Sequence, residues 1–94
     1  MACVYILYSK TLDRYYTGSC LDLESRLKDH KEGKYFSSFT SKAKDWGVFL
    51  SIEDLNYNQA RKIEFHIKRM KSRKYIQNLL KYPEIIKRLR SNYP

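Results

Sequence analysis

An arginine and a histidine follow the apolar stripe of the first predicted helix. Leu23 and Leu27 define this stripe, and Arg26 and His30 lie three and seven residues after Leu23, on the same side. The planar fork of a guanidinium is suited to hold an oxyanion. A structural role is the alternative: an internal salt bridge for Arg26 and a hydrogen-bonded core position for His30.

A glutamate occupies the same kind of position on the second predicted helix. Ala60, Ile63 and Ile67 mark the buried face of this helix, and Glu64 lies four residues after Ala60 and three before Ile67. Because burial of an unpaired carboxylate is costly, Glu64 requires a cation, a metal ion or a wet cleft. A salt bridge with Arg26 would satisfy it without any function. Convergent ionisable groups on separate elements nevertheless favour a functional site.

Two predicted strands place tyrosines on matching faces. Alternate residues of a strand face the same side, so a register that brings Tyr5 and Tyr16 to one face makes their phenols neighbours. Gly18 shares the face of Tyr16 and, lacking a side chain, lets a substrate backbone come close. Aromatic packing between strands is the simpler explanation, which we adopt for Tyr8 and Tyr15.

The surrounding sequence predicts the elements that position these residues. Strands are expected at Val4–Tyr8, Tyr15–Ser19 and Trp46–Glu53, with SKTLD as the turn of a hairpin. Helices are expected at Leu23–Lys31 between Asp22 and Gly33, from Asn56 or Asn58 to Met70, at Arg73–Lys81 after Ser72, and at Glu84–Leu89 after Pro83. An ordered polar loop is expected at 34–44. The order β-β-α-β-α-α, with the last short helix, predicts an α+β domain with a small sheet covered by helices.

Composition narrows the class of protein. The chain has 94 residues, which fit a single domain over 1–94, and its 43% hydrophobic content suffices for one modest core. Its formal net charge of +9 predicts attraction to a polyanion, usually a nucleic acid. Cys3 and Cys20 are expected to be reduced, half-buried strand residues of a cytoplasmic protein. No apolar run approaches the length of a membrane span.

Several short motifs occur together in one order along the chain. They are Tyr5 in VYI, Tyr16 and Gly18 in YTG, Arg26 and His30 in ESRLKDH, and Glu64 in ARKIEFHIK. This ordered set resembles the GIY-YIG nuclease superfamily, over Val4 to about Leu80. It looks most like the small single-domain bacterial branch and is similar to the catalytic domains of the UvrC excision-repair nuclease and of intron-encoded homing endonucleases. VYI and YTG depart from the two eponymous tripeptides, so the specificity lies in the full set.

The resemblance implies a three-stranded antiparallel sheet flanked by helices, and phosphodiester hydrolysis that depends on a single Mg²⁺ or Mn²⁺ ion. The matching positions are Glu64 for the metal ligand, Arg26 for the contact to the scissile phosphate, His30 for an assisting His or Tyr, Tyr5 and Tyr16 for the motif tyrosines, and Asn78 in YIQNLLK, a poor match, for a downstream asparagine. One of the tyrosines, more often the first, is thought in the family to deprotonate or orient the attacking water.

Basic residues interleaved with aromatic ones predict where a nucleic acid would lie. The expected contacts are Lys34, Lys42 and Lys44 near Tyr35, Phe36 and Phe39, Gly18 in the hairpin, and Lys68, Lys71 and Arg73 in KRMKSRKY. As a group the cations predict a salt-dependent affinity without sequence preference, although single lysines also suit a solvated helix face.

These features lead to two hypotheses. The first is a metal-dependent DNA endonuclease, structure-selective or weakly sequence-specific, acting in DNA repair or recombination, with a partner protein as one source of specificity. The second is a binding module for DNA or RNA that retains the fold and hydrolyses little. The sequence does not separate DNA from RNA and specifies no oligomeric state.

Overall fold

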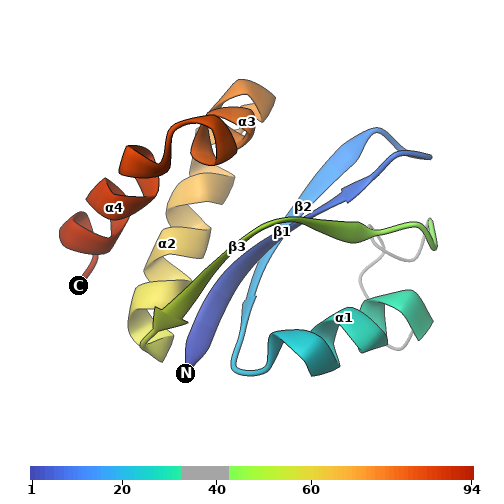
Figure 1. Cartoon of the computed structure of the whole chain (residues 1–94), viewed down its shortest axis with the longest axis horizontal. Helices are drawn as coiled ribbons and strands as arrows, with labels where there is room; N and C mark the ends of the chain where they lie inside the picture. Colours follow the sequence, from blue (N-terminus) through green and yellow to red (C-terminus); the bar gives the residue numbers. More distant parts are fainter. Residues whose placement is uncertain (33–42) are drawn as a thin grey trace.

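The computed structural model describes residues 1–32 and 43–94 of the chain. Strands β1 (Ala2–Ser9), β2 (Arg14–Cys20) and β3 (Gly47–Leu55) form an antiparallel sheet with β1 in the middle, in the order β2-β1-β3 (Figure 1). The helices are α1 (Leu23–Glu32), α2 (Tyr57–Met70), α3 (Arg73–Lys81) and α4 (Pro83–Asn92). The predicted α+β class and three-stranded antiparallel sheet are confirmed. The expected loop at 34–44 lies almost entirely outside the described residues.

The central strand is buried on both of its faces. Ala2, Val4 and Ile6 of β1 pack into the larger core, which α2, α3 and α4 cover with Ile63, Ile67, Leu79 and Leu89. The alternate residues Cys3, Tyr5 and Leu7 belong to a smaller core on the other face, with Trp46 and, at its margin, Leu23 of α1. Figure 1 shows this division, with α1 separated by the sheet from the other three helices. A strand covered on both faces needs apolar residues at successive positions, as VYIL provides.

The register of the hairpin confirms the predicted arrangement of its tyrosines. Tyr5 lies opposite Gly18, and Tyr16 lies opposite Leu7, so both phenols project from one face, with ring centroids 6.3 Å apart. On the other face, Tyr8 lies opposite Tyr15, with centroids 4.9 Å apart. The second pair is the cross-strand packing that the sequence predicted.

Side-chain caps fix the starts of two helices. Asn56, rather than Asn58, caps α2: its side chain accepts from the Gln59 backbone N–H, and the Gln59 side chain accepts in turn from the Asn56 backbone, which completes a capping box. Ser72 caps α3 by accepting from the Tyr75 backbone N–H, as expected. The last helix is longer than the expected Glu84–Leu89: it begins at Pro83 and continues to Asn92.

The two cysteines lie directly opposite each other at one end of the hairpin. Cys3 and Cys20 are free thiols with their Sγ atoms 3.5 Å apart, and both are buried rather than half-buried. Burial raises the pKa of the Cys3 thiol to about 12, and the hydrogen bond and charge of Cys20 act in the same direction. Both thiols therefore behave as small apolar residues of the core. Within residues 1–32 and 43–94, no helix has the length and apolarity needed to cross a bilayer.

Candidate active site

A cleft of about 630 Å³ follows the outer edge of β2, between the first turn of α1 and one side of α2. Its wall is made of Tyr16, Gly18, Ser19, Cys20, Leu21, Asp22, Ser25, Arg26, Tyr57, Arg61, Glu64 and Lys68. Among the described strands β2 lies at the edge of the sheet, so the side chains of two helices can meet along its outer side. The fold thus brings together five of the predicted residues: Tyr16, Gly18, Arg26, Glu64 and Lys68.

Glu64 faces this cleft from the side of α2. Its neighbours Ala60, Ile63 and Ile67 are buried as predicted, while the Glu64 side chain is 15% exposed. Ser19 Oγ donates a hydrogen bond to Glu64 Oε1 at 2.5 Å, and Lys68 Nζ lies 2.7 Å from Oε2 in an i,i+4 ion pair. The cation beside the carboxylate is therefore Lys68. The cleft supplies the partial solvent access that the sequence required.

Arg26 lines the same cleft as Glu64, from the first turn of α1. Asp22 caps α1 by accepting from the Ser25 backbone N–H at 3.3 Å, so the helix begins beside the end of β2 and its first turn places Arg26 in the wall. Arg26 is partly buried, as the predicted inward stripe implied. Leu27 and His30 belong to α1, but their side chains lie outside the described part of the chain.

Tyr16 forms one side of the cleft, and its ring is held by three neighbours. The Tyr5 and Trp46 ring centroids lie 6.3 Å and 6.4 Å away, and Lys68 Nζ lies 5.9 Å from the centroid of Tyr16. Tyr5 is fully buried. Of the two motif tyrosines, Tyr16 is thus the one that lines the cleft.

The reason for glycine at position 18 differs from the one predicted. A Cβ atom built on Gly18 would lie 2.5 Å from the Tyr5 hydroxyl and 2.6 Å from Tyr5 Cζ. The space left by the missing side chain is therefore occupied by the phenol of the opposite strand, rather than kept free for a substrate backbone. Gly18 still contributes its backbone to the cleft wall.

A second groove, of about 540 Å³, continues from the cleft and shares Tyr16 and Lys68 with it. It runs between β2 and the junction of α2 with α3. Four of its side chains are cationic and one is acidic: Arg14, Lys68, Lys71, Arg73 and Asp13. Lys68, Lys71 and Arg73 were predicted from the sequence as contacts to nucleic acid, and all three line this groove.

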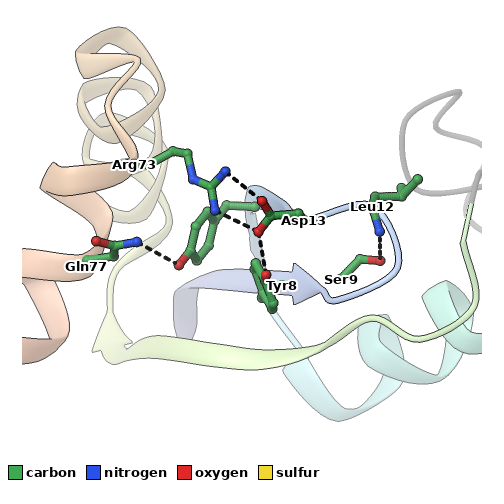
Figure 2. Close-up of polar contacts among 7 residues, drawn as sticks. Tyr8, Ser9, Leu12, Asp13, Arg73 and Gln77 are labelled. Atoms are coloured by element: carbon green, nitrogen blue, oxygen red, sulfur yellow. Dashed lines mark hydrogen bonds and ion pairs between the residues drawn. The ribbon is translucent and has the colours of Figure 1, made fainter.

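Arg73, however, is engaged with the hairpin turn. Its Nη2 and Nη1 atoms lie 2.8 Å and 3.1 Å from the two carboxylate oxygens of Asp13, which also accepts from the Tyr8 hydroxyl at 2.5 Å (Figure 2). The Arg73 and Tyr8 hydrogen bonds lower the pKa of Asp13 to about 2. The hydrogen bond to Asp13, followed by the charge of Asp13, raises the pKa of Arg73. Lys71 is exposed at the end of α2. Lys71 therefore offers the groove a cation, whereas the charge of Arg73 is largely compensated.

The remaining predicted contacts that the structure describes do not line the cleft. Lys44 is exposed, two residues before Trp46, and is not part of the cleft wall. Asn78 lies on α3 and lines neither the cleft nor the adjoining groove. Lys34 and Lys42, with Tyr35, Phe36 and Phe39, lie outside the described residues.

Among the residues of the cleft wall that sequence reasoning missed are Ser19, Tyr57 and Arg61. Tyr57 and Arg61 had a detectable signal, because their spacing from Glu64 and Lys68 puts all four residues on one side of a helix. Ser19 had none. Its hydrogen bond to Glu64 joins residues 45 positions apart, and only the packing of α2 against β2 brings them together.

The donor set fits a divalent ion that keeps most of its own water. Within the described parts of the chain, no group of three or more His, Cys, Asp or Glu side chains gathers in a way that could enclose a metal. Mg²⁺ is commonly held by one or two carboxylates and otherwise by water and phosphate oxygens. Glu64 is partly open to the cleft and supplies one such carboxylate, although a metal ion would have to displace the Lys68 ammonium from Oε2.

Comparison with known proteins gives one family. A search of curated proteins gives no match, and neither does a search of solved structures. The model of the GIY-YIG catalytic domain matches residues 1–77 of this 94-residue chain, from β1 into α3, and so includes every element that lines the cleft. The chain belongs to the GIY-YIG family, which is of the nuclease type.

Proposed function

We propose that the protein is a divalent-metal-dependent endonuclease that hydrolyses phosphodiester bonds of DNA in the cleft beside β2. The observation that carries the proposal is the position of Glu64, a partly buried carboxylate that lines the same cleft as Arg26. Hydrolysis of a phosphodiester needs positive charge at the non-bridging oxygens and an attacking water that is held and deprotonated. The cleft offers a residue for each need.

In this proposal Arg26 contacts the non-bridging oxygens of the scissile phosphate through its planar guanidinium. Glu64 holds Mg²⁺ or Mn²⁺, and the Ser19 hydroxyl keeps that carboxylate directed into the cleft. The metal, when bound, supplies Lewis-acid stabilisation of the developing negative charge. Lys68 moves from Glu64 to the phosphate, since its side chain is half exposed.

Tyr16 is the residue that we assign to the attacking water, because its side chain lines the cleft. In its phenolate form Tyr16 orients the water and accepts its proton, which leaves a neutral phenol on Tyr16. Tyr5 acts through Tyr16 and Gly18, which it contacts from the buried side. We assign the assisting role to His30, four residues after Arg26 on α1.

The groove that continues from the cleft carries the flanking phosphates. Arg14 and Lys71 provide cations along this path. These contacts read phosphate and not sequence, so we propose a structure-selective or weakly sequence-specific enzyme that acts in DNA repair or recombination. A partner protein would then supply further specificity.

The test is nicking of supercoiled plasmid and of labelled branched DNA by wild type and by Glu64→Ala, with Mg²⁺ or Mn²⁺ and with EDTA. We expect nicking by wild type only, lost in EDTA, while circular dichroism shows that the variant is folded. Ser91→Ala, on α4 and outside the cleft, is the matched control and should keep wild-type activity.

Two outcomes would contradict the proposal. Equal nicking by Glu64→Ala and wild type would remove Glu64 from the reaction. Salt-sensitive DNA binding without cleavage of either substrate would favour a binding module on the same fold. Parallel titrations of DNA and RNA would then show which polymer it prefers.

A further inference from the structure

Aromatic and arginine side chains alternate along the outer side of α2. Tyr57, Arg61, Phe65 and Arg69 follow one another at intervals of four residues, one helical turn apart. Tyr57 is 51% exposed and Phe65 is 65% exposed, although both are large apolar rings. We call these four residues the α2 stripe.

Each arginine of the α2 stripe lies over the aromatic ring one turn before it. The guanidinium carbon of Arg61 is 6.0 Å from the centroid of Tyr57, and that of Arg69 is 5.8 Å from the centroid of Phe65. Arg61 Nη1 also donates to the Tyr57 hydroxyl at 3.4 Å. These contacts hold the rings against the helix, so that each ring keeps an exposed surface at low conformational cost.

The charge around the stripe indicates the kind of ligand. The helix carries four cations, Arg61, Lys62, Lys68 and Arg69, and a single carboxylate, Glu64, which is turned into the cleft. The two exposed rings therefore lie on a basic surface, and their positions are about 12 Å apart along the helix axis, at 1.5 Å rise per residue. This combination suits a chain of phosphates whose bases have free faces for stacking. In a duplex those faces are already stacked on one another.

The stripe is continuous with the cleft. Tyr57 and Arg61 belong to the cleft wall together with Glu64, whereas Phe65 and Arg69 extend the same row beyond it. A strand that left the cleft along α2 would meet these side chains in succession.

We propose that the α2 stripe binds unpaired nucleotides of single-stranded DNA next to the cleft, with bases stacked on Phe65 and Tyr57 and phosphates on Arg61 and Arg69. This proposal rests on the proposed function in one respect: the bound strand is part of the substrate only if the protein is a nuclease. The binding itself requires no hydrolysis.

The experiment measures binding of fluorescently labelled oligo-dT and of a blunt duplex in EDTA, by wild type and by Phe65→Ala. Loss of one stacked base should weaken the affinity for oligo-dT about fivefold or more, with little change for the duplex. Leu80→Ala removes another exposed apolar side chain, 53% exposed on α3, and should leave both affinities unchanged.

A second variant reports the contact directly. Phe65→Trp should retain affinity for oligo-dT, and its fluorescence should be quenched by oligo-dT and not by duplex. The native Trp46 is buried, so wild type provides the background.

Equal affinities of Phe65→Ala and wild type for oligo-dT would overturn the proposal, as would a parallel loss for oligo-dT and duplex, or an unquenched Phe65→Trp. Binding is measured in EDTA and therefore does not depend on cleavage. A protein that fails to nick plasmid with Mg²⁺ or Mn²⁺ can still bind oligo-dT in a Phe65-dependent way. That result would refute the proposed nuclease function and support the proposed binding of single-stranded DNA by the α2 stripe. A protein that nicks plasmid but binds oligo-dT independently of Phe65 would support the nuclease function and refute the binding role of the α2 stripe.

Discussion

The phenol of Tyr5 lies against Gly18 of the neighbouring strand, so closely that a Cβ atom at position 18 would be 2.5 Å from the Tyr5 hydroxyl. The two residues are directly paired across the hairpin. Because Tyr5 is fully buried, its ring has no free space into which to move. Glycine at this position is thus required by the tyrosine, and the two motifs that carry these residues are physically coupled.

Gly18→Ala is therefore expected to destabilise the fold by about 1–3 kcal/mol, the usual range for an overpacked core. The measurement is urea unfolding followed by circular dichroism. Gly47→Ala is the control on β3: a Cβ atom there meets nothing within 4 Å, so its stability should be close to wild type. Combining Gly18→Ala with Tyr5→Leu should recover part of the loss, since the clashing phenol is gone. Additive effects of the two changes would mean that they do not interact.

The two motif tyrosines should contribute unequally to cleavage. Tyr16 lines the cleft, whereas Tyr5 reaches it only through Tyr16 and Gly18. We expect Tyr16→Phe to lower the cleavage rate about 10²–10⁴-fold, the range for losing a general base, and Tyr5→Phe to lower it less. Single-turnover cleavage with unchanged circular dichroism is the measurement. If Tyr5→Phe lowers the cleavage rate more than Tyr16→Phe, the role of activating the attacking water belongs to Tyr5.

The periodicity of the sequence was sufficient to predict which face of each element a residue occupies. Glu64 was placed on the inner side of α2 by its spacing from Ala60 and Ile67, and Tyr5 and Tyr16 on one face of the hairpin by strand alternation. These features repeat with the local geometry of a helix or strand, so they can be derived without knowing the fold.

Contacts between distant segments were not predictable in this way. Ser19 meets Glu64 because α2 packs beside β2, and Asp13 meets Arg73 because the first residue of α3 comes within side-chain reach of the hairpin turn. Each pair has ordinary residues at ordinary spacings, so no local pattern marks it. The occupant of the space beside Gly18 was missed for the same reason.

Because Arg73 is paired with Asp13, Lys71 and Arg73 should contribute differently to the salt dependence of DNA binding. Lys71→Gln should reduce the slope of log Kobs against log salt for duplex DNA by about 1, as expected for one lost phosphate contact. Arg73→Gln should change the slope less, because the charge of Arg73 is already balanced by Asp13. The measurement is fluorescence anisotropy at several salt concentrations.

Removing the acid of this pair supplies the complementary test. Asp13→Asn should raise the affinity for duplex DNA, since it releases the Arg73 guanidinium to the groove. Equal slope changes for Lys71→Gln and Arg73→Gln, with no gain in Asp13→Asn, would show that Asp13 does not restrain Arg73 in solution.

His66 predicts how the stability of the helical layer depends on pH. Its Nδ1 and Nε2 atoms lie 3.0 Å and 3.2 Å from the hydroxyls of Tyr93 and Tyr75, so one imidazole connects α2 with α3 and with the chain end after α4. Burial, followed by the charge of Arg69, lowers the pKa of His66 below its usual value. Arg61 and Lys62 line the pocket that it faces and add no negative charge.

The folded protein therefore favours neutral His66, and the unfolded chain binds a proton first as the pH falls. Stability from this group should be complete above about pH 6.5, the reference value for histidine, and should be lost as the pH falls through the lower pKa of the folded state. We expect the urea midpoint to fall over this interval in wild type and less in His66→Gln. His30→Gln, which removes the other histidine of the chain, should retain the step. A step that persists in His66→Gln and disappears in His30→Gln would assign it to α1.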